Sequence, residues 1–384
     1  MDQQAQSEWK ESIMINQQRL LEAFINMTRI DSPSLAERAL ADWLSVQFSA
    51  LGCRVREDQA GSMIGGNCGN LYIDCPGSLP GPSLLFSVHL DRVEPGHHIE
   101  AVLGEDGIIR SAGETILAAD DIAGIAALLE MVRSLKEDNR PHRSIEILMS
   151  VGEEAHLQGI HHVRPDWIKS TEAYIFDTSG APGIAVLEAP GHIRLDITIT
   201  GKSAHAGIEP DKGISAIQVA AVAVNAMRLG QVDSETTANI GSISGGGETN
   251  IVAEQCQITA ECRSRSQSRL HEQADHMEQC VREAADKAGA RAEVRQTISY
   301  LPYQIEPEAP VAARFARACA QIGLTPHYIS TGGGSDNNVL YRHGITGLVL
   351  SCGMQQVHST AECLSLRDLL QTAQLAETLA IDPV

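Results

Sequence analysis

The sequence predicts an α/β protein with a mainly parallel central sheet flanked by helices, and a smaller α+β domain inserted into it. Two observations lead to this prediction. Short, continuous apolar runs alternate with helical segments through most of the chain, whereas strictly alternating strands occupy its middle third. Continuous runs are typical of strands buried on both faces, and alternation is typical of a sheet with one face in water. We therefore expect two sheets of different kinds.

The elements of the larger domain follow from the order of these patterns. Helical spacing covers about residues 16–51, where Asp31 and Ser32 separate two helices. Four later apolar runs are bounded by polar residues, glycine or proline, as buried strands are. They are Leu84–Val88, Ile145–Val151, Tyr174–Phe176 and Leu348–Leu350. Helical segments between them, such as Ile122–Leu135, indicate a mainly parallel sheet.

The middle third predicts the inserted domain. Apolar and polar side chains alternate strictly along His192–Thr200 and again along Cys256–Arg263. This period of two indicates an antiparallel sheet, and an apolar helix near Ile214–Leu229 would cover its dry face. We predict a catalytic domain of residues 1–189 and 301–384, and an inserted lid or dimerisation domain of residues 190–300.

The composition narrows the class of protein. The 384 residues exceed what one hydrophobic core usually serves, and a net charge of −20 makes nucleic acid or an anionic membrane an unexpected partner. The N-terminus carries no signal-peptide pattern, and no run of 18 apolar residues occurs. Nine cysteines without a CxxC pair favour reduced, mostly buried thiols. We therefore expect a cytoplasmic protein.

Side chains of the kinds that can bind metals follow each of the four predicted strands, namely His89 and Asp91, Glu153 and Glu154, Asp177, and, after a short loop, His358. Asp120 and Asp121 follow another short run, Leu117–Ala119, and open the helix Ile122–Leu135. Ligands of open α/β sheets bind at the carboxyl ends of strands, so these side chains should converge. Crowded carboxylates repel one another unless they are protonated or neutralised by cations. Imidazole and carboxylate donors suit zinc, manganese or cobalt, and two such ions bridged by a carboxylate form a hydrolytic centre.

Taken singly, each of these residues has a simpler interpretation. His89 could be a hydrogen-bonded core histidine, and Asp120 a helix N-cap. The Glu153–Glu154 pair could lie in a solvated loop, and His358 at the surface. Their joint occurrence at successive strand ends favours the metal centre.

Five segments, in this order, resemble motifs of the M20 metallopeptidase family, in particular its peptidase T-like branch of aminotripeptidases. They are SVHLDRVEPG, ILAADDIAGIAALLE, SVGEEAHLQGI, GKSAHAGIEP and MQQVHSTAE. The resemblance covers nearly the whole chain. It implies two divalent metal ions per chain, with zinc preferred to manganese or cobalt. The implied ligands are His89, Asp120, Glu154, Asp177 and His358, with Asp120 bridging both ions.

The same resemblance implies the remaining roles. Glu153 would be the general base that takes a proton from the attacking water, and Asp91 would orient His89. His205 would stabilise the oxyanion, within the chain or across a dimer, and Asn250 and Arg263 would contact the substrate. Without the resemblance, these last three residues would be assigned to an exposed loop, strand and turn.

The chain departs from the family pattern at four positions. Arg92, Ile122 and His156 replace residues that are usual in the family, and Gly332 stands where tripeptidases carry a carboxylate-binding arginine. None of these changes removes an implied metal ligand.

We therefore expect a dinuclear metallohydrolase that cleaves an amide bond in a small peptide, acting as an aminopeptidase or tripeptidase, and dimerising through the inserted domain. An N-acyl amino acid deacylase of the same family and a non-catalytic metal- or peptide-binding relative stay open as alternatives. The sequence contains no GxSxG nucleophile elbow, which argues against a serine hydrolase.

Overall fold

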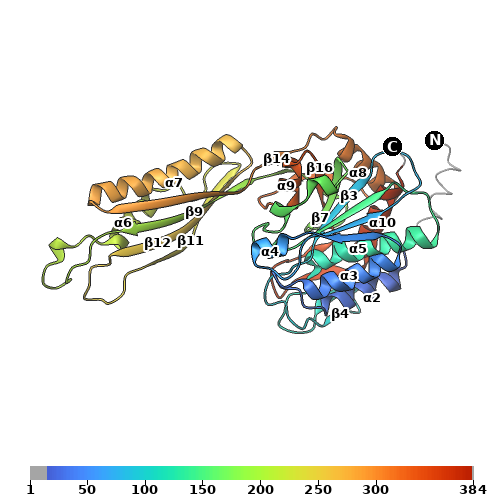
Figure 1. Ribbon diagram of the computed structural model, residues 1–384, viewed down its shortest axis with the longest axis horizontal. Coiled ribbons are helices and arrows are strands. Elements are labelled where there is room, and N and C mark those ends of the chain that lie inside the picture. Colours follow the sequence, from blue (N-terminus) through green and yellow to red (C-terminus); the bar gives the residue numbers. More distant parts are fainter. Residues whose placement is uncertain (1–14, 383–384) are drawn as a thin grey trace. The chain divides into compact units, whose positions relative to one another are not determined.

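The chain folds into a mixed α/β structure with a large mixed sheet, a separate antiparallel sheet and helices, which confirms the predicted fold class (Figure 1). The computed structural model describes residues 15–382. These residues form two compact units. The first lies within Met1–Leu187, Ile305–Ser330 and Ser335–Val384, and the second is Glu188–Gln304 with Thr331–Gly334.

The large sheet has nine strands in the order β1-β2-β6-β3-β7-β16-β8-β14, with β15 paired to β8. They are β1 (Arg54–Glu57), β2 (Leu71–Cys75), β3 (Leu84–His89), β6 (Ile145–Ser150), β7 (Glu172–Thr178), β8 (Ile184–Ala189), β14 (Tyr303–Gln304), β15 (His327–Ser330) and β16 (Thr346–Ser351). The four strands predicted from apolar runs are β3, β6, β7 and β16, and they are the parallel neighbours at its centre. β2 and β8 flank them antiparallel, so the whole sheet is mixed.

Helices cover this sheet, and some of them begin at a side-chain cap. They are α2 (Gln17–Thr28), α3 (Arg38–Ala50), α4 (Ala60–Ile64), α5 (Ala119–Glu137), α8 (Pro310–Gln321), α9 (Asp336–Arg342) and α10 (Leu366–Ile381), with short 3₁₀ turns at Ile160–His162 and Pro165–Trp167. Asn16 caps α2 and Ser365 caps α10, each by accepting a backbone N–H of the first turn. α5 contacts β3 and β7 as well as α2 and α10, so it is buried nearly all round (Figure 1).

A small four-stranded sheet contains the two strands on either side of the loop that carries His358. It consists of β4 (Ala101–Leu103), β5 (Ile108–Ser111), β17 (Met354–Gln355) and β18 (Cys363–Ser365) in the order β17-β18-β5-β4. The loop between β17 and β18 carries His358. The pairing of β18 with β5 therefore anchors that loop to a segment some 250 residues earlier in the chain.

The second unit is a five-stranded antiparallel sheet in the order β10-β11-β12-β9-β13. Its elements are β9 (Gly191–Thr200), α6 (Ala216–Ala226), β10 (Gly230–Gln231), β11 (Thr236–Gly245), β12 (Gln255–Ser264), α7 (Gln267–Ala288) and β13 (Arg291–Tyr300), with a 3₁₀ turn at Pro210–Lys212. The apolar positions of β9 and β12 are buried in one core with residues of α6 and α7. The two strands predicted from strict alternation are thus direct neighbours.

The prediction of reduced thiols is wrong for two cysteines. Cys53 and Cys75 form a disulfide. β1 and β2 are antiparallel, with Arg54 opposite Asp74, so the next pair outward brings these two cysteines face to face. The other seven cysteines are free thiols, and all except Cys363 are buried.

Among the described helices, none combines the length and the apolar character that crossing a membrane requires.

Candidate metal centre

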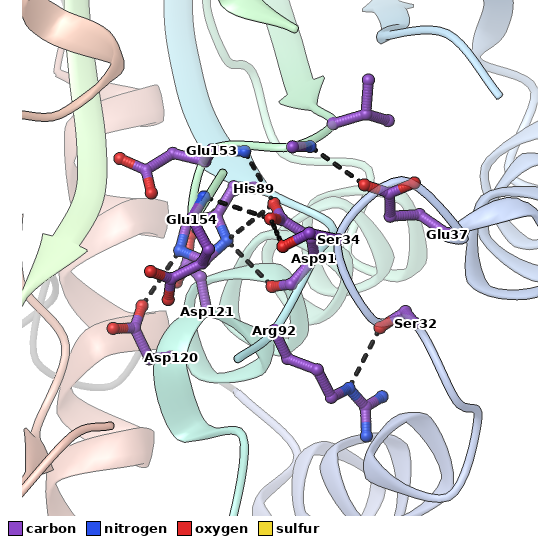
Figure 2. Close-up of polar contacts among 12 residues, drawn as sticks. Ser32, Ser34, Glu37, His89, Asp91, Arg92, Asp120, Asp121, Glu153 and Glu154 are labelled. Atoms are coloured by element: carbon purple, nitrogen blue, oxygen red, sulfur yellow. Dashed lines mark hydrogen bonds and ion pairs between the residues drawn. The ribbon is translucent and has the colours of Figure 1, made fainter. Parts of the chain in front are cut away.

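The predicted ligands meet at the carboxyl-terminal edge of the parallel strands. His89 is the last residue of β3, Asp177 lies at the end of β7, and Glu154 follows the end of β6. Asp120 stands at the start of α5, and His358 comes from the loop between β17 and β18. Figure 2 shows His89, Asp120, Glu153 and Glu154 gathered at this edge. Convergence of this kind is what parallel strand topology produces.

Two groups of ligand atoms share one carboxylate. His89 Nε2 lies 3.0 Å from Asp120 Oδ1 and 3.8 Å from Asp177 Oδ1. His358 Nε2 lies 2.8 Å from Glu154 Oε1 and 3.4 Å from Asp120 Oδ2. In each group the ligand atoms lie within 4.8 Å of one another. The two oxygens of Asp120 therefore face different imidazoles, as the carboxylate of a dinuclear centre does.

The electrostatics of the cluster are those of a site built for cations. Burial, reinforced by neighbouring carboxylates, raises the pKa of both Glu153 and Asp177 well above the ordinary range. Burial disfavours charge on His89, but the hydrogen bonds that its imidazole donates to Asp120 and Asp91 outweigh burial and raise its pKa. Hydrogen bonds to Asp120 and Glu154 raise the pKa of His358 to about 10. All donors are imidazole or carboxylate groups, a set that suits two zinc, manganese or cobalt ions.

The chain is similar to known peptidases in sequence and in fold. The M20 peptidase dimerisation domain matches residues 187–289. The Bacillus subtilis protein YqjE is 38% identical over 362 residues, which are 94% of this chain and 97% of the relative. The structure of aminopeptidase PepT from Bacillus cereus superposes with a TM-score of 0.89 at 38% identity, covering 96% of this chain and 99% of that one. A Staphylococcus aureus tripeptidase superposes with a TM-score of 0.91 at 36% identity, covering 96% and 98%.

The chain belongs to the M20 peptidase family. The resemblance drawn from the five motifs, including the peptidase T-like branch, is therefore confirmed. The chain is accordingly a peptidase, and the remaining details of the site can be compared with what the motifs implied.

Asp91 contacts the backbone of Glu153 and Glu154 as well as the imidazole of His89. His89 Nδ1 lies 3.0 Å from the Asp91 backbone carbonyl and 3.5 Å from its carboxylate, so Nδ1 carries the proton and Nε2 faces the other carboxylates. The Asp91 carboxylate accepts hydrogen bonds from Ser34 Oγ at 2.6 Å and from the backbone N–H groups of Glu153 and Glu154 at 2.9 and 3.1 Å.

Two further carboxylates, which the sequence analysis did not assign a role, hold the ligand segments through their backbones. Asp121 accepts the His89 N–H. Glu362 is buried and accepts the N–H groups of Leu117, Ala118 and Asp120. Glu362 stands four residues after His358 in the MQQVHSTAE segment, which was the available signal.

Asp336 is a third carboxylate that the sequence analysis missed. It lies at the start of α9 and is almost fully buried. Burial raises its pKa to about 6, and its charge contributes to the raised pKa values of Glu153 and Asp177. It belongs to the TGGGSDNN segment, in which only the missing arginine had been considered.

Arg92, one of the departures from the family pattern, points away from the ligands (Figure 2). Its buried guanidinium donates to the carbonyls of Thr28, Ile30 and Gly96, and to Ser32 Oγ. It therefore ties down the end of α2 and the loop that follows. This departure serves the scaffold rather than the ligand set.

Of the three predicted residues of the second unit, His205 and Asn250 lie together and Arg263 lies apart from them. His205 is exposed, and the next residue, Ala206, donates its N–H to the carbonyl of Asn250, so these two predicted residues are neighbours. Arg263 contacts Glu261 and lies 3.4 Å from the Gly332 carbonyl. In the sheet Arg263 pairs with His192 at the start of β9, whereas His205 follows the end of that strand. A ten-residue strand separates them by about 30 Å.

Proposed function

We propose that this M20 peptidase is a dinuclear, zinc-dependent hydrolase that cleaves an amide bond in a small peptide. The observation that carries the proposal is the position of Asp120, whose two oxygens face His89 and His358 separately. In this proposal His89, Asp120 and Asp177 hold one ion. Asp120, Glu154 and His358 hold the other.

Glu153 is the proposed proton carrier. Bound divalent ions would supply Lewis acidity and lower the pKa of an attacking water towards neutrality. Glu153 then takes the proton of that water and passes it to the leaving amine. In the metal-free protein, burial and the neighbouring carboxylates raise the pKa of the Glu153 carboxyl, so this group can hold a proton there.

The second unit is proposed to complete the site and to form the dimer. His205 would stabilise the oxyanion, and Asn250 and Arg263 would bind the peptide. The separation of His205 from Arg263 along β9 supports a division of labour in which the His205 of one protomer serves the site of its partner. The match to a peptidase dimerisation domain supports a homodimer through residues 190–300.

Small peptides are the proposed substrates because the two similar structures are an aminopeptidase and a tripeptidase. Gly332 leaves this chain without the arginine expected near Thr331–Asn338. We therefore propose that Arg263, which lies beside Gly332, supplies the positive charge for a peptide carboxylate. A screen of di- and tripeptides and N-acyl amino acids, each with zinc, manganese or cobalt, identifies the substrate class.

Metal analysis combined with one substitution tests the mechanism. The purified protein should contain close to two zinc ions per chain, and a chelator should abolish peptide hydrolysis. Glu153→Gln should keep both ions and lower kcat by about 10³-fold or more, because the proton carrier is lost while the ligands remain. Hydrolysis that survives the chelator, or a Glu153→Gln enzyme with ordinary kcat, would refute the proposal.

A further inference from the structure

The segment that carries Glu153 and Glu154 is held by side chains that act on its backbone. Four consecutive N–H groups each donate to a side-chain oxygen. Val151 donates to Asn70 Oδ1 at 3.1 Å, Gly152 to Glu37 Oε1 at 2.9 Å, Glu153 to Asp91 Oδ1 at 2.9 Å and Glu154 to Asp91 Oδ2 at 3.1 Å. Asn70, Glu37 and Asp91 are all buried.

These acceptors are needed because the segment leaves the sheet inside the protein. β6 ends at Ser150, and Val151 and Gly152 are buried just beyond it. Gly152 has φ +60°, a left-handed turn that directs the following residues toward the ligands. A buried N–H without an acceptor costs about 1–3 kcal/mol, so the turn depends on side-chain partners.

Glu37, unlike Asp91, has no hydrogen bond to His89, so its contact with the segment is through the backbone alone. It stands at the start of α3, and its Oε1 also accepts the N–H of Leu35 at 2.8 Å. The same loop reaches Asp91 through Ser34 Oγ. Figure 2 shows Ser34 beside Asp91, below Glu153, with Glu37 to the right of them. The loop before α3 thus touches this segment both directly and through Asp91.

We propose that Glu37 is a positioning residue for the Glu153–Glu154 pair. The proposal rests on the proposed function, in which Glu153 carries the proton and Glu154 holds an ion. The Gly152 N–H directly precedes both carboxylates, so its hydrogen bond to Glu37 fixes where the turn places them. Misplacement of reacting groups by about 1 Å lowers catalysis by about 100-fold, and loss of supporting partners weakens metal sites by about 10- to 100-fold.

The chain offers a matched control in Glu146. This buried carboxylate lies at the other end of β6 and accepts the backbone N–H groups of Lys169 and Ser170. Glu146→Ala removes a buried carboxylate with the same kind of backbone partners, but away from the metal site. Glu37→Gln is the conservative variant, because its amide oxygen can still accept the Gly152 N–H.

The test compares wild type, Glu37→Ala, Glu37→Gln and Glu146→Ala. For Glu37→Ala we expect kcat for a tripeptide to fall roughly 10- to 100-fold with KM little changed. Zinc affinity should fall about 10-fold, and amide exchange of residues 151–154 in the metal-free protein should accelerate. Glu37→Gln should restore most of each value. Glu146→Ala should lower the melting temperature while kcat and exchange at residues 151–154 stay unchanged.

The proposal is overturned if Glu37→Ala loses no more kcat than Glu146→Ala, or if amides 151–154 exchange as in wild type. If Glu37→Ala does not fold, Glu37→Asp, whose shorter side chain falls short of Gly152, should give a smaller loss of the same kind. A wild-type protein without hydrolysis would sink the proposed function instead. The exchange measurement on metal-free protein still decides the role of Glu37 in that case.

Discussion

At the residue scale, the two histidines of the site sit among carboxylates that stabilise their charged forms. Asp120 and Glu154 hydrogen-bond His358 and raise its pKa to about 10, although half of its side chain is exposed. In the metal-free protein His358 is therefore protonated at neutral pH. A metal ion must displace that proton before Nε2 can coordinate it.

This competition predicts that metal affinity rises with pH. Below the raised pKa, each pH unit should strengthen zinc binding about tenfold for the proton that His358 releases. Calorimetric titration of metal-free protein near pH 7, in buffers of different ionisation enthalpy, measures the protons released. His358→Asn should release about one fewer. Equal proton release by wild type and variant would contradict the assignment of His358 as a ligand.

The convergence of the proposed ligand residues could be predicted from the sequence, whereas most of the side chains that hydrogen-bond to their backbones could not. His89, Glu154 and Asp177 follow apolar runs that predict buried strands. Because these strands are parallel, the three side chains are expected at the same edge of the sheet. Glu37 accepts the N–H of a residue 115 positions away, and backbone donors leave no mark on side-chain patterns. The Cys53–Cys75 disulfide was missed because the register of β1 and β2 brings the two cysteines together, and the sequence pattern does not show that register.

At the element scale, the position of Asp120 depends on how closely α5 approaches the sheet. Gly124 lies one turn beyond Asp120, and its N–H donates to Asp121 Oδ1. A Cβ atom at this position would lie 2.8 Å from Val88 Cγ1 of β3 and 2.9 Å from Phe176 Cβ of β7. Only glycine allows this contact, so it sets the spacing between the Asp120 and His89 elements.

Gly124→Ala should therefore destabilise the protein, although alanine is the better helix former by about 1 kcal/mol. Overpacking of this kind costs about 1–3 kcal/mol, and the displaced α5 should also weaken zinc binding. Thermal unfolding and metal titration check both effects. Gly113→Ala is the control, because a Cβ atom there meets nothing within 4 Å. An unchanged melting temperature for Gly124→Ala would show that α5 can shift freely.

The predicted elements are those with a strong apolar period. β3, β6, β7 and β16 carry continuous apolar runs, and β9 and β12 alternate strictly. β13 was missed because Gln296 interrupts its apolar face, which consists of Ala292, Val294, Ile298 and Tyr300. α7 was also missed, although its buried residues Leu270, Ala274, Met277 and Val281 recur at helical spacing within a charged sequence.

At the scale of the whole molecule, the second unit exposes apolar side chains on one side of its sheet. On α6, Ile217 is 43% exposed and Val222 57%, and on β11 Ile243 is 52% exposed. Ile243 pairs with the buried Ile258, so it points to the face that α6 covers. Beyond the two residues that pair with β10, β11 also leaves its outer edge open. An apolar rim beside an open edge favours a two-fold contact with a second copy.

The predicted interface therefore consists of α6 and the open edge of β11. If wild type is the proposed dimer by light scattering, the double variant Ile217→Asp, Val222→Asp should be a monomer, because association would bury two unpaired carboxylates. Ile298→Asp is the matched control, since Ile298 is 47% exposed on β13 at the opposite edge of the same sheet. If Ile298→Asp abolishes the dimer and the α6 variant does not, the protomers join through β13. If His205 serves the partner's site, the monomeric variant should also lose most of its kcat while it keeps its two metal ions. An unchanged kcat in that monomer would place His205 in the site of its own chain.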